Sequence, residues 1–182
     1  MGNKEEFLKN IKDNKITLIV GILFLITSLV SAIMVYFEKN KEMDNVKPLS
    51  EVTKAEEYAS VDVQIMTDYF AKNDYAGIEH KTYIVWDNQE KPYMYIVDLN
   101  DKTREALNSI YDYSYAEEEM DAPETVTIKG MTKTIPSDLK KIAINAYNEL
   151  YGEKLMTTSN FSDYFGVVYL DTFESPMNNL MT

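Results

Sequence analysis

Residues 16–37 read ITLIVGILFLITSLVSAIMVYF, a stretch of 22 residues that contains no charged side chain. At about 1.5 Å per residue, a helix of this length spans about 33 Å, which is enough to cross the hydrocarbon core of a bilayer. Tyr36 and Phe37 end the stretch, and aromatic rings favour the membrane interface. The stretch therefore predicts a single transmembrane helix, preceded by a short tail of residues 1–15.

Lysine residues flank the apolar stretch on both sides, with four before it and three shortly after it. This small excess of positive charge favours a cytoplasmic N-terminus, so we expect a single-pass signal anchor in the cell membrane with an extracellular C-terminal domain. The alternative is a cleaved signal peptide, because residues 30–32 (VSA) resemble a cleavage site. The apolar run continues through Phe37, whereas the core of a signal peptide is about 7–15 residues long, and this favours the anchor.

Residues 38–182 have the length of one domain and carry 27 acidic and 14 basic residues, a net charge of −13. Such a charge repels phosphate backbones, so we expect no nucleic-acid partner. The chain has no cysteine, which excludes a disulfide framework and thiolate metal sites. Composition therefore predicts an acidic domain that is stabilised by its core alone.

Alternating apolar residues mark the first strand of this domain. Val61, Val63 and Ile65 alternate with polar residues inside residues 58–70, after a stalk and short helix at residues 38–57. The same patterns, with turn residues between them, predict a loop at residues 71–79, strands at 81–86 and 92–98 joined by a hairpin turn at 87–91, and strands at 124–135 and 164–173.

Two amphipathic helices are predicted between these strands. The first covers residues 100–113, with Asn100 or Asp101 as its cap. The second covers residues 137–151, with Ser137 as its cap and Gly152 at its end. Its apolar residues recur at helical spacing and are predicted to face the core, namely Leu139, Ile142, Ala143, Ala146 and Leu150.

The predicted order is strand, strand, strand, helix, strand, helix, strand. Three strands, a helix and two more strands are typical of an OB-fold, a five-stranded partly open barrel. The second helix is an addition between strands four and five, and Gly130 in strand four suggests a bulge. We therefore expect a mixed α+β, mainly β domain, an OB-like barrel over residues 58–173 with a flexible tail at 174–182. Another α+β sheet with two helices on one face is the alternative.

The chain also resembles uncharacterised single-span proteins of Gram-positive gut bacteria that carry a small OB-like exported domain. The resemblance rests on the lysine-flanked span, on EYASVDVQ at residues 57–64 and on VTIKGMTKTIPSDLKKIAINAYNEL at residues 126–150. It covers nearly the whole chain and brings no catalytic motif with it. What it implies is a fold and a location, and no activity.

No motif for nucleotide binding, metalloprotease, hydrolase, kinase or calcium-loop chemistry occurs in the chain. The single histidine, His80, is expected in a loop and is interpreted as structural or exposed. The acidic run at residues 117–121 lacks the alternating ligands and the glycine of a calcium loop, so it is interpreted as a solvated loop. We therefore predict no catalytic residue, no metal site and no cofactor.

Aromatic side chains are the stronger indication of function. They form two groups, one beside the predicted hairpin and one at the end of the first helix, and OB-like folds commonly bind oligomers or partner chains near that hairpin. The candidate partner-binding residues are Trp86, Tyr93 and Tyr95 in the first group and Tyr111, Tyr113 and Tyr115 in the second. The alternative is that these rings pack in the barrel core.

These observations predict a membrane-anchored, non-catalytic binding or interaction module of the cell envelope, with a protein or an envelope polymer as its partner. Two alternatives remain at this point. One is a glycan hydrolase or transferase that uses acidic residues, which would require two carboxylates about 5–10 Å apart in one cleft. The other is a structural subunit of a membrane complex in which the span itself is the interface.

Overall fold

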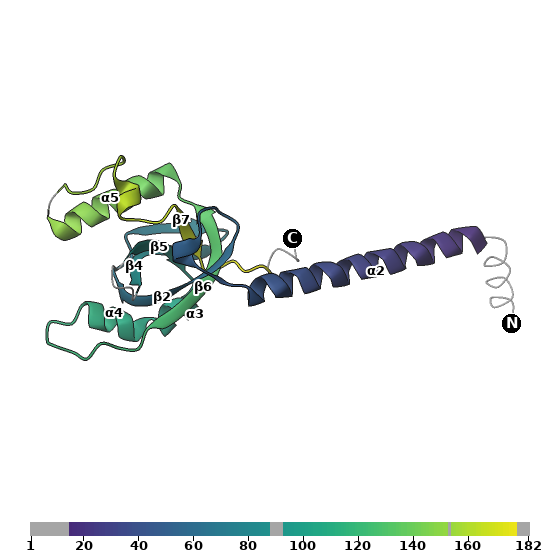
Figure 1. Ribbon diagram of the computed structural model, residues 1–182, viewed down its shortest axis with the longest axis horizontal. Helices are drawn as coiled ribbons and strands as arrows, with labels where there is room; N and C mark the ends of the chain where they lie inside the picture. The colour runs from purple at the N-terminus through teal and green to yellow at the C-terminus, as the bar shows by residue number, and fades with distance from the viewer. Residues whose placement is uncertain (1–14, 88–92, 153, 178–182) are drawn as a thin grey trace.

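In the computed structural model, which describes residues 15–87, 93–152 and 154–177, a long helix projects from a β-barrel (Figure 1). This helix, α2 (Lys15–Asp44), includes the predicted apolar stretch and continues into the charged stalk, where it ends ahead of Pro48. Its length and composition are those of a membrane span, and its apolar part is not buried against the rest of the chain. A signal sequence meets the same criteria. Of the predicted tail, only Lys15 lies within the described residues.

Five strands close into a barrel, which confirms the expected five-stranded architecture. Each strand is hydrogen-bonded to the next, and the pairing of β2 with β4 closes the barrel. All of these pairs are antiparallel except β5 with β7, which is parallel. The helices therefore pack on a closed barrel and not on an open sheet. In order around the barrel, the strands are β2 (Tyr58–Met66), β6 (Val126–Thr134), β7 (Val168–Asp171), β5 (Met94–Leu99) and β4 (Ile78–Asp87).

The first barrel strand alternates as predicted only as far as Val63. Val61 and Val63 are buried inside the barrel, but Ile65 is 40% exposed. The pairing register of β2 with β4 shifts between Val63 and Ile65, so the side chain of Met66 is buried instead. The predicted alternation therefore fails at Ile65, because a register shift interrupts the period of two.

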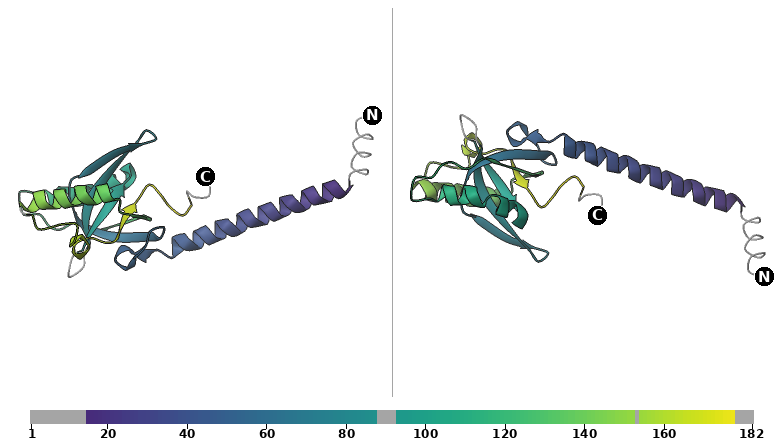
Figure 2. Two further views of the ribbon diagram at one scale, coloured as in Figure 1. Left: turned by 90° about the horizontal axis from the view of Figure 1, so that it is seen from above. Right: turned by 90° about the horizontal axis from the view of Figure 1, so that it is seen from below.

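Residues 71–79, predicted as a loop, form part of a β-ribbon that extends beyond the barrel (Figure 2). Strand β3 (Ala71–Tyr75) pairs antiparallel with the first half of β4, which begins at Ile78. The two turn residues, Ala76 and Gly77, have φ angles of 54° and 79°, a left-handed conformation that is typical of tight hairpin turns. The loop prediction was wrong because this ribbon is exposed on both faces, so no apolar alternation marks it.

A short connection joins α2 to the barrel. It consists of β1 (Lys47–Pro48), which pairs parallel to β2, and a single 3-10 turn, η1 (Leu49–Glu51). Leu49 and Val52 are buried in the barrel core. The short helix predicted within residues 38–57 is therefore only this turn, which begins at Leu49 directly after Pro48.

The predicted helix at residues 100–113 is divided into α3 (Asp101–Ala106) and α4 (Asn108–Ser114). They meet at Leu107, which is fully buried together with Ile110 in the core cluster inside the barrel. The predicted cap is confirmed, because the Asn100 side chain accepts a hydrogen bond from the Thr103 N–H at 2.9 Å.

Asn100 also joins this helix to the last strand of the barrel, because its backbone N–H donates to Thr172 Oγ1 and its side-chain amide donates to the Thr172 carbonyl. We expect Asn100→Ala to lower the free energy of unfolding by about 1–2 kcal/mol, the usual effect of losing a cap. Urea unfolding measures the change, with Asn100→Asp as the variant that keeps the capping oxygen. An Asn100→Ala protein as stable as the parent would contradict this role.

Helix α5 (Ser137–Tyr151) has the predicted limits. Gly152 ends it in the left-handed conformation with φ 67°, but the N-cap position belongs to Pro136, so the prediction of Ser137 as cap is wrong. The predicted buried face is also wrong in part. Its buried residues are Ala143, Ile144 and Tyr147, while Ile142 and Leu150 are 43% and 57% exposed.

Two apolar clusters form the core. The first fills the barrel. The second, the outer cluster, lies between the outer face of β4 and β5 and a layer made by α5 and the 3-10 turn η2 (Phe161–Asp163). Both faces of β5 are therefore buried, which explains the apolar run at residues 94–97 of this strand. The predicted hairpin turn between β4 and β5 lies outside the described residues beyond Asp87. In the predicted tail, Pro176 is buried.

Candidate binding groove

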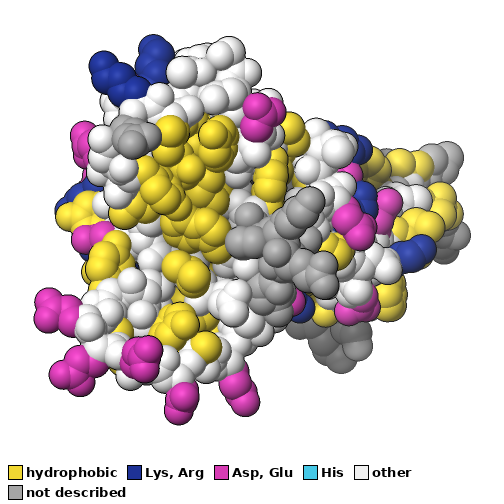
Figure 3. Space-filling view, turned by 60° about the vertical axis from the view of Figure 1, so that its left-hand side comes forward, with side chains coloured by type: hydrophobic (Ala, Val, Ile, Leu, Met, Phe, Trp, Pro, Cys, Tyr) yellow, Lys and Arg dark blue, Asp and Glu magenta, His cyan; other side chains and the backbone are white. Residues whose placement is uncertain are grey.

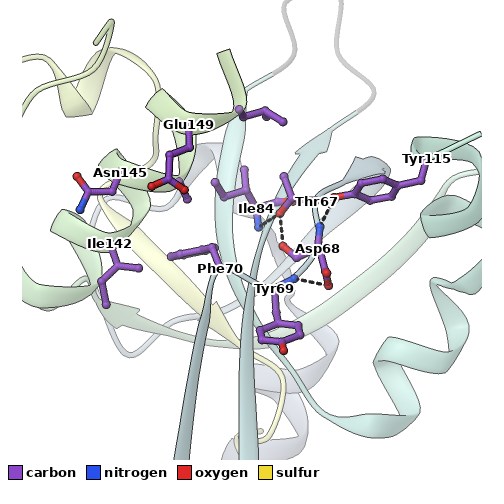
Figure 4. Close-up of a pocket in the computed structure, with 11 residues that line it drawn as sticks. Thr67, Asp68, Tyr69, Phe70, Ile84, Tyr115, Ile142, Asn145 and Glu149 are labelled. Atoms are coloured by element: carbon purple, nitrogen blue, oxygen red, sulfur yellow. Dashed lines mark hydrogen bonds between the residues drawn. The ribbon is translucent and has the colours of Figure 1, made fainter. Parts of the chain in front are cut away.

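A groove with a volume of about 580 Å³ lies between α5 and the segment that links β2 to β3. Figure 4 shows Ile142, Asn145 and Glu149 of α5 on one side and Thr67 to Phe70 on the other, with Tyr115 at the far end. We call it the distal groove, since α5 and α4 lie on the side of the barrel away from α2 (Figure 1). It is lined by Thr67, Asp68, Tyr69, Phe70, Ile84, Tyr115, Ile142, Asn145, Ala146, Glu149 and Leu150.

Hydrogen bonds fix the wall of the groove that faces α5. The Thr67 hydroxyl accepts from the Ile84 N–H at 3.1 Å and donates to the Asp68 carbonyl at 2.7 Å. The Asp68 N–H donates to the Tyr115 hydroxyl, and the Asp68 carboxylate accepts from the Tyr69 N–H at 2.8 Å. This wall is therefore ordered before any ligand binds, which lowers the entropic cost of binding.

Much of the groove surface is apolar and open to solvent. Ile142, Leu150 and Tyr115 are 43%, 57% and 51% exposed, and Tyr69 is 45% exposed. Figure 3 looks onto this end of the domain and shows apolar side chains gathered in one area, with acidic side chains around its lower rim. A contiguous exposed apolar area with a polar rim is typical of an interaction site.

The charged residues at the groove are acidic. Asp68 and Glu149 line it, and among its lining residues in the described part of the chain there is no lysine or arginine. The acidic run of residues 117–121 begins two residues after Tyr115. The groove therefore combines an apolar floor with a negative rim, which complements an apolar ligand that carries positive charge.

The first group of predicted binding residues lies mostly in the core. Tyr95 is 1% exposed, points into the barrel and donates to Asp87 Oδ2 at 3.1 Å, and its burial raises the pKa of its phenol. Tyr93 is half-buried and donates to the Phe165 carbonyl at 2.7 Å, and Trp86 packs against the outer cluster. These contacts give all three rings a structural role.

The second group of predicted binding residues contributes one residue to the groove. Tyr111 is half-buried under the Arg104 guanidinium, whose carbon lies 4.5 Å from the ring centre, and Tyr113 is also half-buried. Tyr115 is exposed and lines the groove, and its ring lies tilted against that of Tyr111 with 4.9 Å between the ring centres. The α5 side of the groove was not predicted from the sequence. Its signal was the apolar stripe of α5, which was predicted to face the core.

His80 lies in strand β4 and not in a loop, so that expectation is wrong. Its Nδ1 is 2.7 Å from Asp98 Oδ2, and its ring stacks on Phe173 with 3.9 Å between the ring centres. Asp98 pairs in register with Asp171, which binds Lys133 at 2.6 Å. In the described part of the chain, no three His, Asp or Glu side chains form a group able to hold a metal ion.

A family model covers nearly all of the chain. Residues 3–175 match the family described as a domain of unknown function, DUF8577. The chain belongs to this family. No curated protein and no solved structure matches the chain. The match therefore extends from the apolar helix through the last barrel strand, and it assigns no activity to the chain.

The buried Asp98 carboxyl makes stability depend on pH. Burial raises the pKa of Asp98 above its ordinary value of 3.8, and the hydrogen bond from His80 offsets part of this increase. Because the folded state holds this proton more tightly than the unfolded chain, the contribution of Asp98 to the free energy of unfolding decreases as the pH rises from about 3.8 to the raised pKa.

We therefore expect Asp98→Asn to flatten the pH dependence of stability in this range. Urea midpoints measured at a series of pH values for both proteins test the expectation. Equal slopes for Asp98→Asn and the parent would show that the carboxyl is not held in its protonated form by burial.

Proposed function

We propose that this protein is a membrane-anchored, non-catalytic binding module of the cell envelope. In this proposal, its distal groove holds an apolar segment of a partner polypeptide that is flanked by basic residues. The observation that carries the proposal is the exposed apolar stripe of α5, because Ile142, Ala146 and Leu150 line the groove although their spacing is that of a core-facing helix.

The anchor and its orientation have their own support. Helix α2 has the length and composition of a span, and the lysine excess before it favours a cytoplasmic N-terminus with the domain outside. Helix α5, which forms one wall of the groove, lies at the end of the domain away from α2 (Figure 1), where an extracellular partner can reach it. The resemblance to single-span proteins of Gram-positive bacteria agrees with this placement.

The strand order supports an OB-like relationship for the barrel. Helices α3 and α4 lie between the third and the fourth barrel strand in the chain, as the OB-fold pattern predicts. Helix α5 is the addition, and it forms one wall of the groove. The binding site proposed here is therefore made by the element that departs from the standard barrel.

The charge of the domain supports a basic partner. Residues 38–182 carry a net charge of −13, and Asp68 and Glu149 place negative charge at the groove itself. An anionic envelope polymer would be repelled by this field, whereas lysine or arginine residues next to an apolar segment would be attracted. Among envelope components, a polypeptide with such a segment therefore fits best.

Selection from a random peptide display library tests this proposal, with the full chain in nanodiscs as the target and empty nanodiscs as the control. We expect the selected peptides to share apolar residues flanked by lysine or arginine, and to bind more weakly as salt is added because salt screens the charges. Peptides without basic flanks, or no enrichment over empty nanodiscs, would contradict the proposal.

A further inference from the structure

The tip of the β3–β4 ribbon exposes two large apolar side chains. Tyr75 and Ile78 pair across the end of the ribbon and are 72% and 52% exposed. The turn between them is ordered, because the Asp74 carboxylate accepts a hydrogen bond from the Gly77 N–H at 3.0 Å. A stiff ribbon that presents an aromatic and a branched aliphatic residue at its end is suited to contact an apolar surface.

The ribbon points toward the end of the domain from which α2 emerges. Both views in Figure 2 show its tip at about the level of the end of α2 that joins the domain, displaced well to one side of that helix. Helix α2 continues for seven residues, 38–44, between its apolar stretch and the domain. Seven helical residues span about 10 Å, and the headgroup layer of one leaflet is about 5–8 Å thick. A membrane that contains residues 16–37 therefore places its headgroups close to the ribbon tip.

The charges near the tip are balanced. Lys72 and Lys81 both pair with Glu79, and the pairing with Lys81 has a distance of 2.7 Å. Together with Asp74 they leave this part of the ribbon with no net charge, in contrast to the strongly acidic domain as a whole. The tip can therefore approach a lipid surface without the repulsion that the rest of the domain would meet.

We propose that the ribbon tip is a second membrane contact, in which Tyr75 and Ile78 enter the lipid headgroup layer. The inference rests on the proposed anchoring of the chain by α2. Tyrosine favours this layer because its ring is apolar and its hydroxyl remains hydrated. Two contacts, α2 and the ribbon, hold the domain in one orientation and keep the distal groove turned away from the membrane.

The chain has no cysteine, so single introduced cysteines allow the contact to be measured. Asn73→Cys, which is exposed in β3 near the tip, and Thr158→Cys, which is exposed in the loop before η2, each receive a fluorophore in the full chain in liposomes. Lipids with a spin label on the headgroup then quench the fluorophore. We expect about threefold more quenching at position 73 than at 158, because quenching requires a position within the headgroup layer of about 5–8 Å.

A third protein combines Asn73→Cys with Tyr75→Ser and Ile78→Ser, and its quenching should fall to the level of position 158. Equal quenching at positions 73 and 158, or quenching that persists in this third protein, would overturn the inference. Extraction of the chain from liposomes by alkaline carbonate addresses the anchor separately. A chain that is extracted refutes the proposed anchor, whereas one that stays but shows no quenching at position 73 refutes only the ribbon contact.

Discussion

Replacing Gly130 with alanine is expected to lower the free energy of unfolding by about 3 kcal/mol, the upper end of the usual cost of overpacking. A Cβ atom at this position would lie 2.2 Å from the carbonyl oxygen and 2.7 Å from the carbonyl carbon of Asp171. Both atoms belong to the backbone of β7, so no side chain can rotate to make room. The strand pair β6–β7 would have to separate, and this pair is part of the closed barrel.

Gly166→Ala is the matched control. There, an added Cβ would meet the Tyr95 ring at 3.6 Å and the Val168 carbonyl oxygen at 3.7 Å, which are ordinary contact distances. We expect this variant to stay within about 1 kcal/mol of the parent. Urea unfolding followed by circular dichroism measures both. If Gly130→Ala and Gly166→Ala were equally stable, the close approach of β6 and β7 would be refuted.

The second large effect is expected from lysine substitutions two residues apart on α5. Ile144 is 9% exposed and packs in the outer cluster, so Ile144→Lys buries a charge without a partner and should cost about 4 kcal/mol. Ile142 is 43% exposed at the groove, so Ile142→Lys should change stability by no more than about 0.5 kcal/mol. Thermal or urea unfolding distinguishes the two faces directly.

Ile142→Lys also tests the groove. It places a positive charge on the apolar floor, so we expect peptides selected against the parent to bind about 100-fold more weakly, a loss of about 3 kcal/mol. Thr158→Lys adds the same charge at an exposed residue that does not line the groove, and should leave binding unchanged. If a folded Ile142→Lys protein bound these peptides as tightly as the parent does, the binding site would lie outside the groove.

Helix α5 shows how far the sequence predicts this structure. Pro136 and Gly152 determine its limits, because proline ends the preceding strand and glycine adopts the left-handed conformation, and both effects are local. Which face of α5 is buried depends on tertiary contacts, and the spacing of its apolar residues does not determine those contacts. Tyr147 is buried and packs on Tyr164, with 5.3 Å between the ring centres, and this contact turns Ile142 and Leu150 outward.

The barrel was predictable for a different reason. Burial is visible in the sequence of both strands, because the inward-facing valines of β2 recur with a period of two and β5, buried on both faces, has an apolar run. The β3 ribbon leaves no such record because both of its faces are exposed. Tyr95 was a candidate binding residue, whereas its side chain lies in the barrel core. Because β5 is buried on both faces, its sequence does not reveal which of its residues point into the barrel.

The proposed function depends most directly on the position of the groove outside the cell. Asn145→Cys places a single thiol in the groove, and Asn3→Cys places one in the N-terminal tail. Intact cells are treated with a membrane-impermeant maleimide, and lysed cells provide the reference. We expect position 145 to be labelled in intact cells and position 3 only after lysis. Labelling of position 145 only after lysis would contradict the proposed function.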